Sequence, residues 1–472
     1  VGRYARTHGP FLVSEAAAAL GLPVGVVATA LARLEQSGRV VAGAFRPGGE
    51  GREWVDDGVL KRLKRRSLAV LRSEIEPVEP EGLARFEIGW QGLSPDPPRG
   101  RNALADAIHK LTGVPVPAST LERDVLAARV ADPGTGIDEL MLTGDLVWIG
   151  HDGLGSRDGR IALYPRDSLE TLWAGPDPDH TPGETETMIL ESLSGRGASF
   201  FRDIYESAGG GDPEETLEAL WDLVWAGLVT NDTFGPVRAY TSRRKARGGG
   251  RRPLSSRFPA HAQGRWSLTT SMSSGETSET ERHAAWAGLL LDRHGVVTRR
   301  TVLAEGFPGG FSALYPVFSH LEDTGRIRRG YFVEGLGGSQ FALPGAVDRL
   351  RSPSSDGLVV IAATDPANPY GGVLPWPEIE EVRLARDAGA YVLLQDGRLV
   401  GYLDKGRRGL TLFDVSTDGF GEVSRALAEV AGRYRKLTLV TVNGEPAPTS
   451  PLAAPLREWG FATAPRGLTF RG

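Results

Sequence analysis

One local pattern occurs four times along the sequence, and it limits the possible folds more than any other feature. In each copy an amphipathic helical segment ends at a glycine, and apolar or β-branched residues follow at once. The four glycines are Gly38, Gly144, Gly227 and Gly325. A helix ends before such a glycine because the first position after the helix takes a left-handed backbone, which glycine adopts without steric cost. A hairpin is expected after each glycine.

The residues on either side of the glycine complete a known unit. Before Gly38, one helical segment covers residues 14–22 and a second begins near Pro23. After it, strands close on Trp54 and Val55, and the fourth copy closes in the same way on residues 341–344. Two helices joined by a glycine-containing turn and followed by a hairpin form a winged helix-turn-helix. One copy would be weak evidence, since any helix-hairpin unit gives it, but four in order predict a tandem array.

The pattern changes after residue 356. Apolar segments at 358–363, 391–394 and 399–403 are typical of strands, and Asp396-Gly397 between the last two predicts a tight hairpin turn. Further strands are expected at 410–413 and 437–442, with a helix near 420–434. Consecutive antiparallel strands favour a barrel-like or open sheet. The predicted fold is therefore mostly α with β: tandem winged helix-turn-helix domains followed by an antiparallel β-barrel-like module.

These patterns divide the chain into six segments. The predicted segments are a winged helix at 1–75, a helical linker and winged helix at 76–175, a winged helix at 182–240, a basic and Ser/Thr-rich linker at 241–281, a winged helix at 282–352, and a β-barrel-like α+β module at 356–472.

Composition excludes several classes of protein. The chain has no cysteine, which excludes disulfides, thiolate zinc sites and cysteine nucleophiles, and its 8 histidines form no cluster at metal-ligand spacing. No metal site is predicted. No apolar run approaches the roughly 20 residues of a membrane span, and no signal-peptide pattern opens the chain, so we expect a cytoplasmic protein without a membrane partner. Because it opens at Val1, inside a helix-like segment, we expect a fragment of a longer protein.

The second helices of the repeats carry the wrong charge for reading DNA bases. The third begins Asp212-Pro213-Glu214-Glu215 and continues through Glu218 and Asp222, and the second carries Asp138 and Glu139. Base recognition in the major groove needs Arg, Lys, Asn or Gln on this helix, and carboxylates repel phosphate. The aromatic residues of the fourth indicate packing. We therefore expect most of these helices to pack as scaffold, which argues against a sequence-specific transcription factor.

Basic residues gather elsewhere, although the net charge is -5. One group lies on a short helix after the first hairpin, another in the predicted linker, and a pair near the fourth repeat. The linker group is equally consistent with a solvated tether. Contacts to phosphate predict binding that is insensitive to base sequence. The predicted DNA-binding residues are Lys61, Arg62, Lys64, Arg65, Arg66, Arg72, Arg243, Arg244, Lys245, Arg299 and Arg300.

Several longer segments are specific enough to suggest a family, among them residues 8–11, 85–92, 223–232, 330–335 and 364–371. They resemble the C-terminal region of Lhr-type (large helicase-related) superfamily 2 DNA helicases. The resemblance covers essentially the whole chain, and it implies an ATP-dependent 3′-to-5′ DNA helicase of DNA repair whose C-terminal half carries winged helices and a β-barrel and self-associates.

The family pattern is incomplete in one respect. The chain contains no Gly-x-x-x-x-Gly-Lys-Ser/Thr phosphate loop, so ATP and magnesium are expected in the motor of the parent protein and no cofactor in this chain. The partners that the resemblance implies are DNA, single-stranded or 3′-tailed, the helicase's own motor domains and further copies of the chain.

A base-excision enzyme is the alternative function. The array is similar in architecture to crosslink-unhooking DNA glycosylases, although their Gln-x-Gln motif is absent. A glycosylase for uracil or an alkylated base needs a polar group that places water and a pocket for the flipped base. Asp365, Asn368 and Tyr370, in a proline-bounded loop after a strand, are the candidate catalytic residues. The competing interpretation is an Asx-type turn that fixes the loop.

Overall fold

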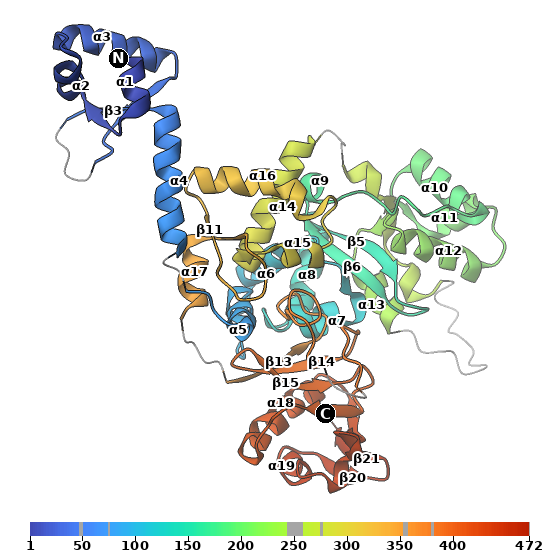
Figure 1. Cartoon of the computed structure of the whole chain (residues 1–472). Helices are drawn as coiled ribbons and strands as arrows, with labels where there is room; N and C mark the ends of the chain where they lie inside the picture. Colours follow the sequence, from blue (N-terminus) through green and yellow to red (C-terminus); the bar gives the residue numbers. More distant parts are fainter. Residues whose placement is uncertain are drawn as a thin grey trace.

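Four small antiparallel sheets with one common strand order lie along the chain (Figure 1). The computed structural model describes residues 1–46, 51–73, 76–242, 258–273, 277–352, 357–378 and 382–471. In each of these sheets the last strand of the unit lies between the other two. The orders are β1-β3-β2, β4-β6-β5, β7-β9-β8 and β10-β12-β11. This shared topology confirms the prediction of tandem winged helices.

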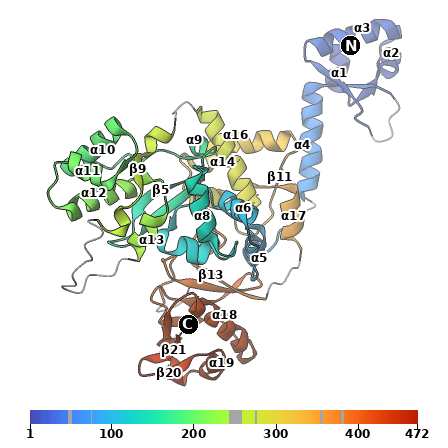
Figure 2. The ribbon, with the colours of Figure 1, turned by 180° about the vertical axis from the view of Figure 1, so that it is seen from behind.

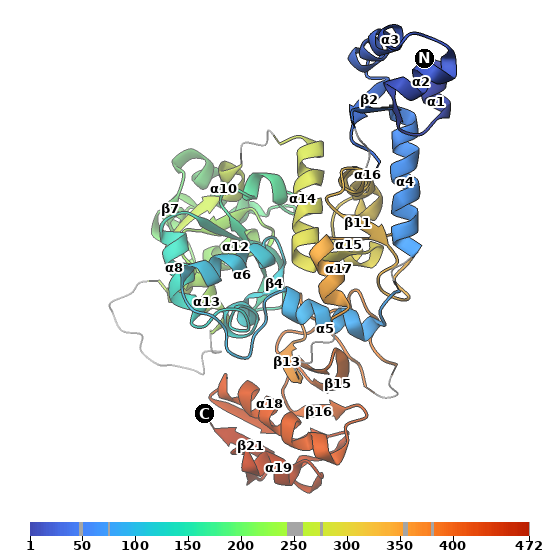
Figure 3. The same cartoon turned by 90° about the vertical axis from the view of Figure 1, so that its left-hand side faces the viewer.

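The first winged helix has a core of its own. Residues Ala5, Phe11, Val27, Leu31 and Trp54 are buried together in it. Figures 1 and 3 show this unit standing apart from the rest of the molecule at one end of helix α4. Its elements are α1 (Gly2–Thr7), β1 (Phe11–Leu12), α2 (Val13–Leu20), α3 (Val24–Gln36), β2 (Val40–Gly43), β3 (Glu53–Asp56) and the connecting α4 (Asp57–Ser73).

The second and third winged helices share one hydrophobic core. Trp148 from the second unit and Trp221 and Trp266 from the third are fully or almost fully buried in it. The second unit comprises α5 (Pro80–Trp90), α6 (Arg101–Leu111), β4 (Val116–Pro117), α7 (Ala118–Thr120), the π-helix Leu121–Leu126, α8 (Pro133–Leu142), β5 (Leu146–Gly153), β6 (Gly159–Pro165) and α9 (Leu169–Leu172). The third comprises α10 (Glu184–Arg196), β7 (Ser199–Phe200), α11 (Phe201–Ser207), α12 (Pro213–Trp225), β8 (Val229–Asn231), α13 (Gly235–Thr241) and β9 (Arg265–Leu268).

The fourth winged helix packs on the other face of the β5–β6 hairpin. Ile149 and Tyr164 of the hairpin lie in one core with Leu290 and Phe318 of the fourth unit. The second unit is therefore the central one, with its neighbours on either side (Figure 2). The fourth unit comprises α14 (Glu279–His294), β10 (Val296–Val297), α15 (Arg299–Ala304), α16 (Gly310–Asp323), β11 (Arg328–Gly330), β12 (Gln340–Ala342) and α17 (Pro344–Leu350).

The C-terminal module is built on an open sheet, one of the two forms expected from its strands, and the barrel-like form is not confirmed. Its six strands run in the order β13-β14-β15-β16-β18-β19, and within the described residues the first and last strands are not paired. A second sheet has the order β17-β21-β20. The elements are β13 (Leu358–Ala362), β14 (Tyr391–Gln395), β15 (Arg398–Leu403), β16 (Gly409–Leu412), α18 (Phe420–Gly432), β17 (Lys436–Leu439), β18 (Thr441–Val442), β19 (Glu445–Pro446), α19 (Ala453–Glu458), β20 (Ala462–Ala464) and β21 (Gly467–Arg471).

The helix ends predicted at the four glycines are confirmed. Gly38, Gly144, Gly227 and Gly325 have φ between 67° and 78°. In every copy the glycine N–H and the next N–H bond back to carbonyls of the last helical turn, with N···O distances of 2.8–3.0 Å. This double bond pattern is the Schellman motif, and it directs the chain straight into the wing.

The third wing extends farther along the chain than expected. Strand β9 lies within the segment predicted as a linker, and it pairs with both β7 and β8. The predicted boundary at residue 240 is therefore too early, because the hairpin of this unit contains α13 and a long basic insertion between its two strands. Hairpin pairing between distant residues gives no local sequence signal.

Two glycines of the second wing allow α12 to pack directly on it. A Cβ atom at Gly150 would lie 2.1 Å from the carbonyl oxygen of Val224, and one at Gly159 would lie 2.5 Å from the Trp225 ring. Such distances are far below van der Waals contact, so both positions require glycine. The helix that reads DNA in other winged helices is here pressed against a neighbouring domain.

Gly150→Ala should therefore destabilise the shared core of the second and third units. Overpacking against backbone costs about 1–3 kcal/mol, which should appear as a lower unfolding temperature in calorimetry. Gly195→Ala in α10 is the matched control: its Cβ would meet nothing within 4 Å, and alanine inside a helix gains about 0.5–1 kcal/mol. Equal unfolding temperatures for the two variants would contradict this account of the contact.

Candidate nucleic-acid interface and the cavity at His294

Helix α4 presents most of the predicted DNA-binding residues. Lys61, Arg62, Lys64 and Arg66 are exposed on it. Lys61 forms an ion pair with Asp57 one turn earlier, at 2.9 Å. Of Arg65 and Arg72 only the backbone is described, and both positions lie in the same helix. The structure thus brings these six positions together on one connecting helix.

The remaining predicted DNA-binding residues lie elsewhere. Arg243, Arg244 and Lys245 fall outside the described residues. Arg299 and Arg300 are exposed at the start of α15. The Arg300 guanidinium donates to the carbonyl of Val373 at 3.5 Å. This pair is therefore separate in sequence and in secondary structure from the group on α4.

The second helices of the winged units pack as expected. In α12, seven of the thirteen residues are buried. In α16, the rings of Phe311, Tyr315 and Phe318 all lie within 6.1 Å of the Phe341 ring. On α8, Asp138 is held by Arg238 at 2.8 Å. Helix α3 of the first unit is different, because it exposes Val24 and Val26 by 55% and 54%.

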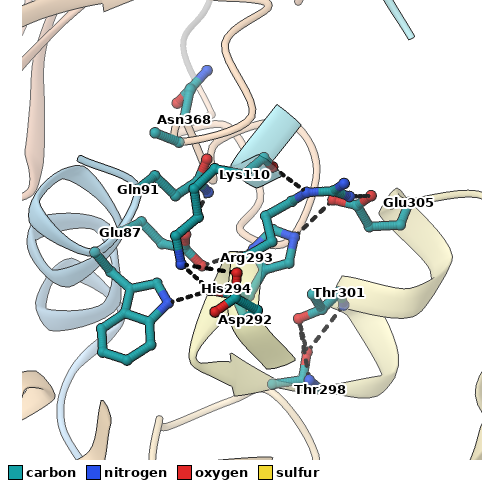
Figure 4. A network of polar contacts seen from close by, with 12 residues as sticks. Glu87, Gln91, Lys110, Asp292, Arg293, His294, Thr298, Thr301, Glu305 and Asn368 are labelled. Carbon is teal, nitrogen blue, oxygen red and sulfur yellow. Dashed lines mark hydrogen bonds and ion pairs between the residues drawn. The ribbon is translucent and has the colours of Figure 1, made fainter. Parts of the chain in front are cut away.

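A buried histidine lies between two glutamates where three segments meet (Figure 4). His294, the last residue of α14, contacts Glu87 of α5 through Nδ1 at 3.0 Å and Glu305 through Nε2 at 2.7 Å. Burial alone would lower the pKa of His294, but the two carboxylates outweigh it and raise the pKa to about 9. The side chain is therefore an imidazolium at neutral pH, bridging α5 and the residue after α15.

A buried arginine next to this histidine completes the charge balance. Arg293 has no exposed surface. Its guanidinium donates to Glu305 and to the carbonyls of Lys110 and Thr112. Burial would raise the pKa of Glu305, yet Arg293 and His294 lower it to about 2. Two cations and two carboxylates thus compensate one another where α14 ends against α5 and α6.

A glycine and two capping donors fix the end of α14 at this place. The carbonyl of Asp292 accepts from the Trp90 indole at 2.8 Å and from the Lys110 ammonium. Such bonds satisfy a last-turn carbonyl that the helix leaves unpaired. Gly295, the first residue after the helix, has a φ of 63°, and a Cβ there would lie 2.8 Å from the Phe86 and Trp90 rings. Only glycine lets the two helices approach this closely.

The predicted catalytic residue Asp365 belongs to the same polar network. Its carboxylate accepts two bonds from the Arg129 guanidinium at 2.7 and 2.8 Å, and the two residues are 0% and 3% exposed. Arg129 also donates to the Gln91 side chain at 3.2 Å, and Gln91 donates to Glu87 at 2.7 Å. A continuous chain of contacts therefore runs from Glu305 through His294 to Asp365.

The other two candidates for catalysis are bound within the loop. The Asn368 amide donates to the carbonyl of Ala363 at 2.9 Å, and its oxygen accepts the Tyr370 N–H at 3.1 Å. The Tyr370 hydroxyl donates to the Gly397 carbonyl at 2.9 Å, and burial raises its pKa to about 12. The Asp365 carboxylate also accepts the Ala367 N–H at 2.8 Å. These are the bonds of an Asx-type turn.

A cavity of about 300 Å³ lies between this loop, the His294 cluster and the second winged helix. This volume leaves room for a single nucleobase. Thr364 contributes a hydroxyl that has no hydrogen-bond partner among the described residues. The residues that line the cavity include Glu87, Pro117, Arg160, His294, Glu305, Thr364, Asn368, Gly372 and Arg386. In this arrangement both glutamates are bound to His294, so neither is free to act as a base.

Within the described ranges, no three His, Asp or Glu side chains are grouped so that they could hold a metal ion. No single described helix is long and apolar enough to cross a membrane. Helices α2 and α3 together have the length and composition of a membrane span, but the pair is bent by 116°.

The residues of the polar network were not identified from the sequence, apart from Asp365. Glu87, Gln91, Arg129 and Arg293 are scattered over some 200 positions and form no motif. The one available signal is the position of Arg293 and His294 at the end of an amphipathic helix, directly before a glycine. Polar residues on the buried side of a helix are rare unless they are paired.

Taken together, the fold defines a tandem winged-helix protein with an exposed basic connecting helix. The family description "Large helicase-related protein, winged-helix domain" matches residues 78–166 and 276–358. A protein of Mycolicibacterium smegmatis named "Lhr helicase/ probable uracil glycosylase" is 42% identical over 508 aligned residues, covering 100% of this chain and 33% of that protein. An Escherichia coli protein named "Lhr helicase/uracil glycosylase" is 33% identical, covering 99% of this chain and 33% of its own length.

Two winged-helix units of the chain thus match the large helicase-related family, and the whole chain is similar to a region of two of its members, as the resemblance implied. It spans about a third of the length of the two relatives. A solved structure, the DNA glycosylase AlkZ of Streptomyces sahachiroi, aligns with 78% of this chain and 99% of its own at a TM-score of 0.44 and 16% identity. That likeness is too low to define a fold or a function.

The charge state of His294 should make stability fall as the pH rises. Folding raises its pKa from 6.5 to about 9, so its contribution is complete below pH 6.5 and is lost as the pH passes 9, up to roughly 3 kcal/mol. Denaturant unfolding between pH 6.5 and 9.5 measures this slope. His294→Gln should flatten it, and the exposed His8→Gln should not. An unchanged slope in His294→Gln would show that another group titrates.

Proposed function

We propose that this chain is the non-motor, DNA-engaging arm of an ATP-dependent 3′-to-5′ DNA helicase of DNA repair, and that it binds DNA without regard to base sequence. The observation that carries the proposal is the exposed basic face of α4. The two relatives are named as helicases, and this chain contains no phosphate loop, so ATP hydrolysis belongs to the motor domains with which it would work.

The geometry of α4 suits a phosphate backbone. A helix of 17 residues is about 25 Å long at 1.5 Å per residue, which spans several phosphates of one strand. Its four exposed cations with described side chains lie within two turns, from Lys61 to Arg66. Lysine and arginine at such a surface bind phosphates through charge and release condensed counterions. Single-stranded or 3′-tailed DNA is the proposed substrate.

The winged helices themselves are proposed to hold the arm in shape. Helices α12 and α16 are packed into hydrophobic cores and cannot enter a groove without breaking them. The apolar surface of α3, with exposed Val24 and Val26, is the proposed contact with the motor domains or with another copy of the chain. The mass of the chain in solution, compared with that of Val24→Ser/Val26→Ser, tests self-association.

Replacing Lys64 and Arg66 by alanine should weaken binding to every DNA sequence alike. The logarithmic salt dependence of the affinity should lose roughly 0.7–0.9 units for each phosphate contact removed. Fluorescence anisotropy with two unrelated 3′-tailed oligonucleotides at several salt concentrations measures both quantities.

The matched control is Arg33→Ala, which removes an exposed arginine from α3 of the first unit. It should leave the affinity and the salt slope nearly unchanged. A salt slope that stays the same in the α4 variant, or a loss confined to one sequence in Arg33→Ala, would place the DNA on a different surface.

Excision of uracil from DNA is a second candidate function, and the names of both relatives favour it. The cavity beside Asn368, with a volume of about 300 Å³, has room for one base. In this proposal Asp365, Asn368 and Tyr370 shape the loop that receives the flipped base. The two functions are compatible, since a helicase arm that holds single-stranded DNA would bring bases to this cavity.

Incubating the chain with uracil-containing single strands, followed by alkali, should give cleavage at the uracil. Thr364→Val should lower the yield at least tenfold with the unfolding temperature unchanged, because the Thr364 hydroxyl faces no described partner whose bond would be lost. Thr463→Val, at an exposed position of β20, is the control. Absence of an abasic product from the folded chain would remove the enzymatic proposal and leave the DNA-binding one untouched.

A further inference from the structure

A second cavity lies at the third winged helix, on a surface that repels DNA. It has a volume of about 660 Å³ and is bounded by the tip of the β5–β6 hairpin, the start of α10, α12 and the end of α13. Its lining contains five carboxylates and three large aromatic rings but no lysine or arginine. These residues are Asp152, Asp177, Glu186, Glu218, Asp222, Trp221, Trp225 and Tyr240.

Three of the five carboxylates lack an ion-pair partner among the described residues, although His180 opposes the rise in the pKa of Asp222. Asp152 is paired with Arg160 at 2.6 Å, and Glu186 contacts His180 at 3.4 Å. Asp177, Glu218 and Asp222 form no ion pair within the part of the chain that the structure describes. Burial, together with Glu186 and Glu218, raises the pKa of Asp222. The cavity is thus a site of concentrated negative charge, which favours a cation.

The aromatic residues form the inner wall of the cavity. The Trp221 ring lies 4.2 Å from Tyr240 and 5.2 Å from Trp225, centroid to centroid. A guanidinium or ammonium group near the face of such rings is attracted by their electron density, and more strongly when water is excluded. Aromatic rings combined with carboxylates are the surroundings in which a basic side chain is bound.

An unpaired donor in the wall points to a ligand that is more than a simple cation. Trp225 is 7% exposed, and its Nε1–H has no hydrogen-bond partner among the described residues. A Cβ at Gly153, which lines the cavity, would lie 3.7 Å from Cδ1, the ring atom bonded to Nε1. The six-membered ring lies on the opposite side, at Gly159. The five-membered ring of the indole, which carries Nε1, therefore lies toward Gly153, one of the residues that line the cavity.

A buried donor without an acceptor destabilises the folded protein. Nε2 of His151, which donates or accepts according to the tautomer, is also buried in this wall without a described partner. A ligand that satisfies the Trp225 N–H must offer a hydrogen-bond acceptor close to a positive charge. A peptide backbone carbonyl beside an arginine or lysine side chain has this chemistry, whereas a nucleic acid would bring phosphates next to the carboxylates.

We propose that this cavity binds a basic side chain of a protein partner, with the cation among Glu218, Asp222 and the aromatic rings, and a backbone carbonyl of the same segment accepting the Trp225 N–H. The site would dock a partner on the third winged helix. It is independent of the DNA-binding surface on α4, which belongs to another part of the chain.

The probe is an acetylated and amidated Gly-Arg-Gly peptide, titrated into the full chain and followed by tryptophan fluorescence. Saturable quenching is expected, with little or none for the matched Gly-Gln-Gly peptide. Glu218→Gln/Asp222→Asn should weaken binding at least tenfold. Trp225→Phe, which keeps an aromatic ring but removes the indole N–H, should weaken it severalfold. Glu191→Gln/Asp203→Asn, acidic residues of the same unit outside the lining, should have no effect.

Three results would overturn the proposal. The first is equal binding of the two peptides, and the second is binding that is indifferent to Glu218→Gln/Asp222→Asn. The third is competition by single-stranded DNA that survives in Lys64→Ala/Arg66→Ala, because the cavity would then accept nucleic acid. Binding that appears only after the seven basic residues between 243 and 257 are replaced by serine would also overturn it, since the ligand would then be this chain itself.

Discussion

The arrangement of the domains depends on one buried polar chain of contacts, from Glu305 through His294, Glu87, Gln91 and Arg129 to Asp365. It connects the fourth winged helix, helix α5, the second winged helix and the C-terminal module. A buried ion pair adds little net stability compared with apolar packing, but losing one partner leaves a charge in a nonpolar interior and costs several kcal/mol. The network therefore favours one arrangement of the domains, because two of its ion pairs join different units: His294 of the fourth unit with Glu87 of the second, and Arg129 of the second with Asp365 of the C-terminal module.

Within this arrangement, the winged helices serve as building blocks more than as readers of DNA. The close contact of α12 with the glycines of the second wing uses the surface that a DNA-binding winged helix keeps free. Acidic residues at the start of α12 are compatible with its role as a helix that packs into the shared core. Asp212 caps the helix by accepting the Glu214 N–H at 2.9 Å, so its carboxylate has a structural role. Basic charge is left to α4, which is exposed because it joins two separate cores.

The sequence predicted the repeated elements well because their signals are local. A glycine that ends a helix, an Asp-Gly turn with positive φ at Asp396 and Gly397, and the aromatic contacts within α16 depend on neighbouring residues. The sequence did not decide between a barrel-like and an open sheet in the C-terminal module, and it did not predict the late strand β9, because strand pairing depends on residues far apart. Asp365 was noticed as a polar residue in a loop, but its partner Arg129 is 236 positions away. No spacing in the sequence indicates that pair, so a structural carboxylate and a catalytic one look the same.

The separation of charge has a consequence for how the arm meets its ligands. Figures 1 and 2 show α4 and the third winged helix on opposite sides of the molecule, with the second and fourth units between them. Fields from exposed charges fall off over about 10 Å at 0.1 M salt, so the acidic cavity would not weaken the phosphate binding proposed at α4. A net charge of -5 is compatible with that proposal, because DNA would respond to the local field of one helix. The separation of the two surfaces would also allow the proposed basic partner to bind at the third unit without competing with DNA.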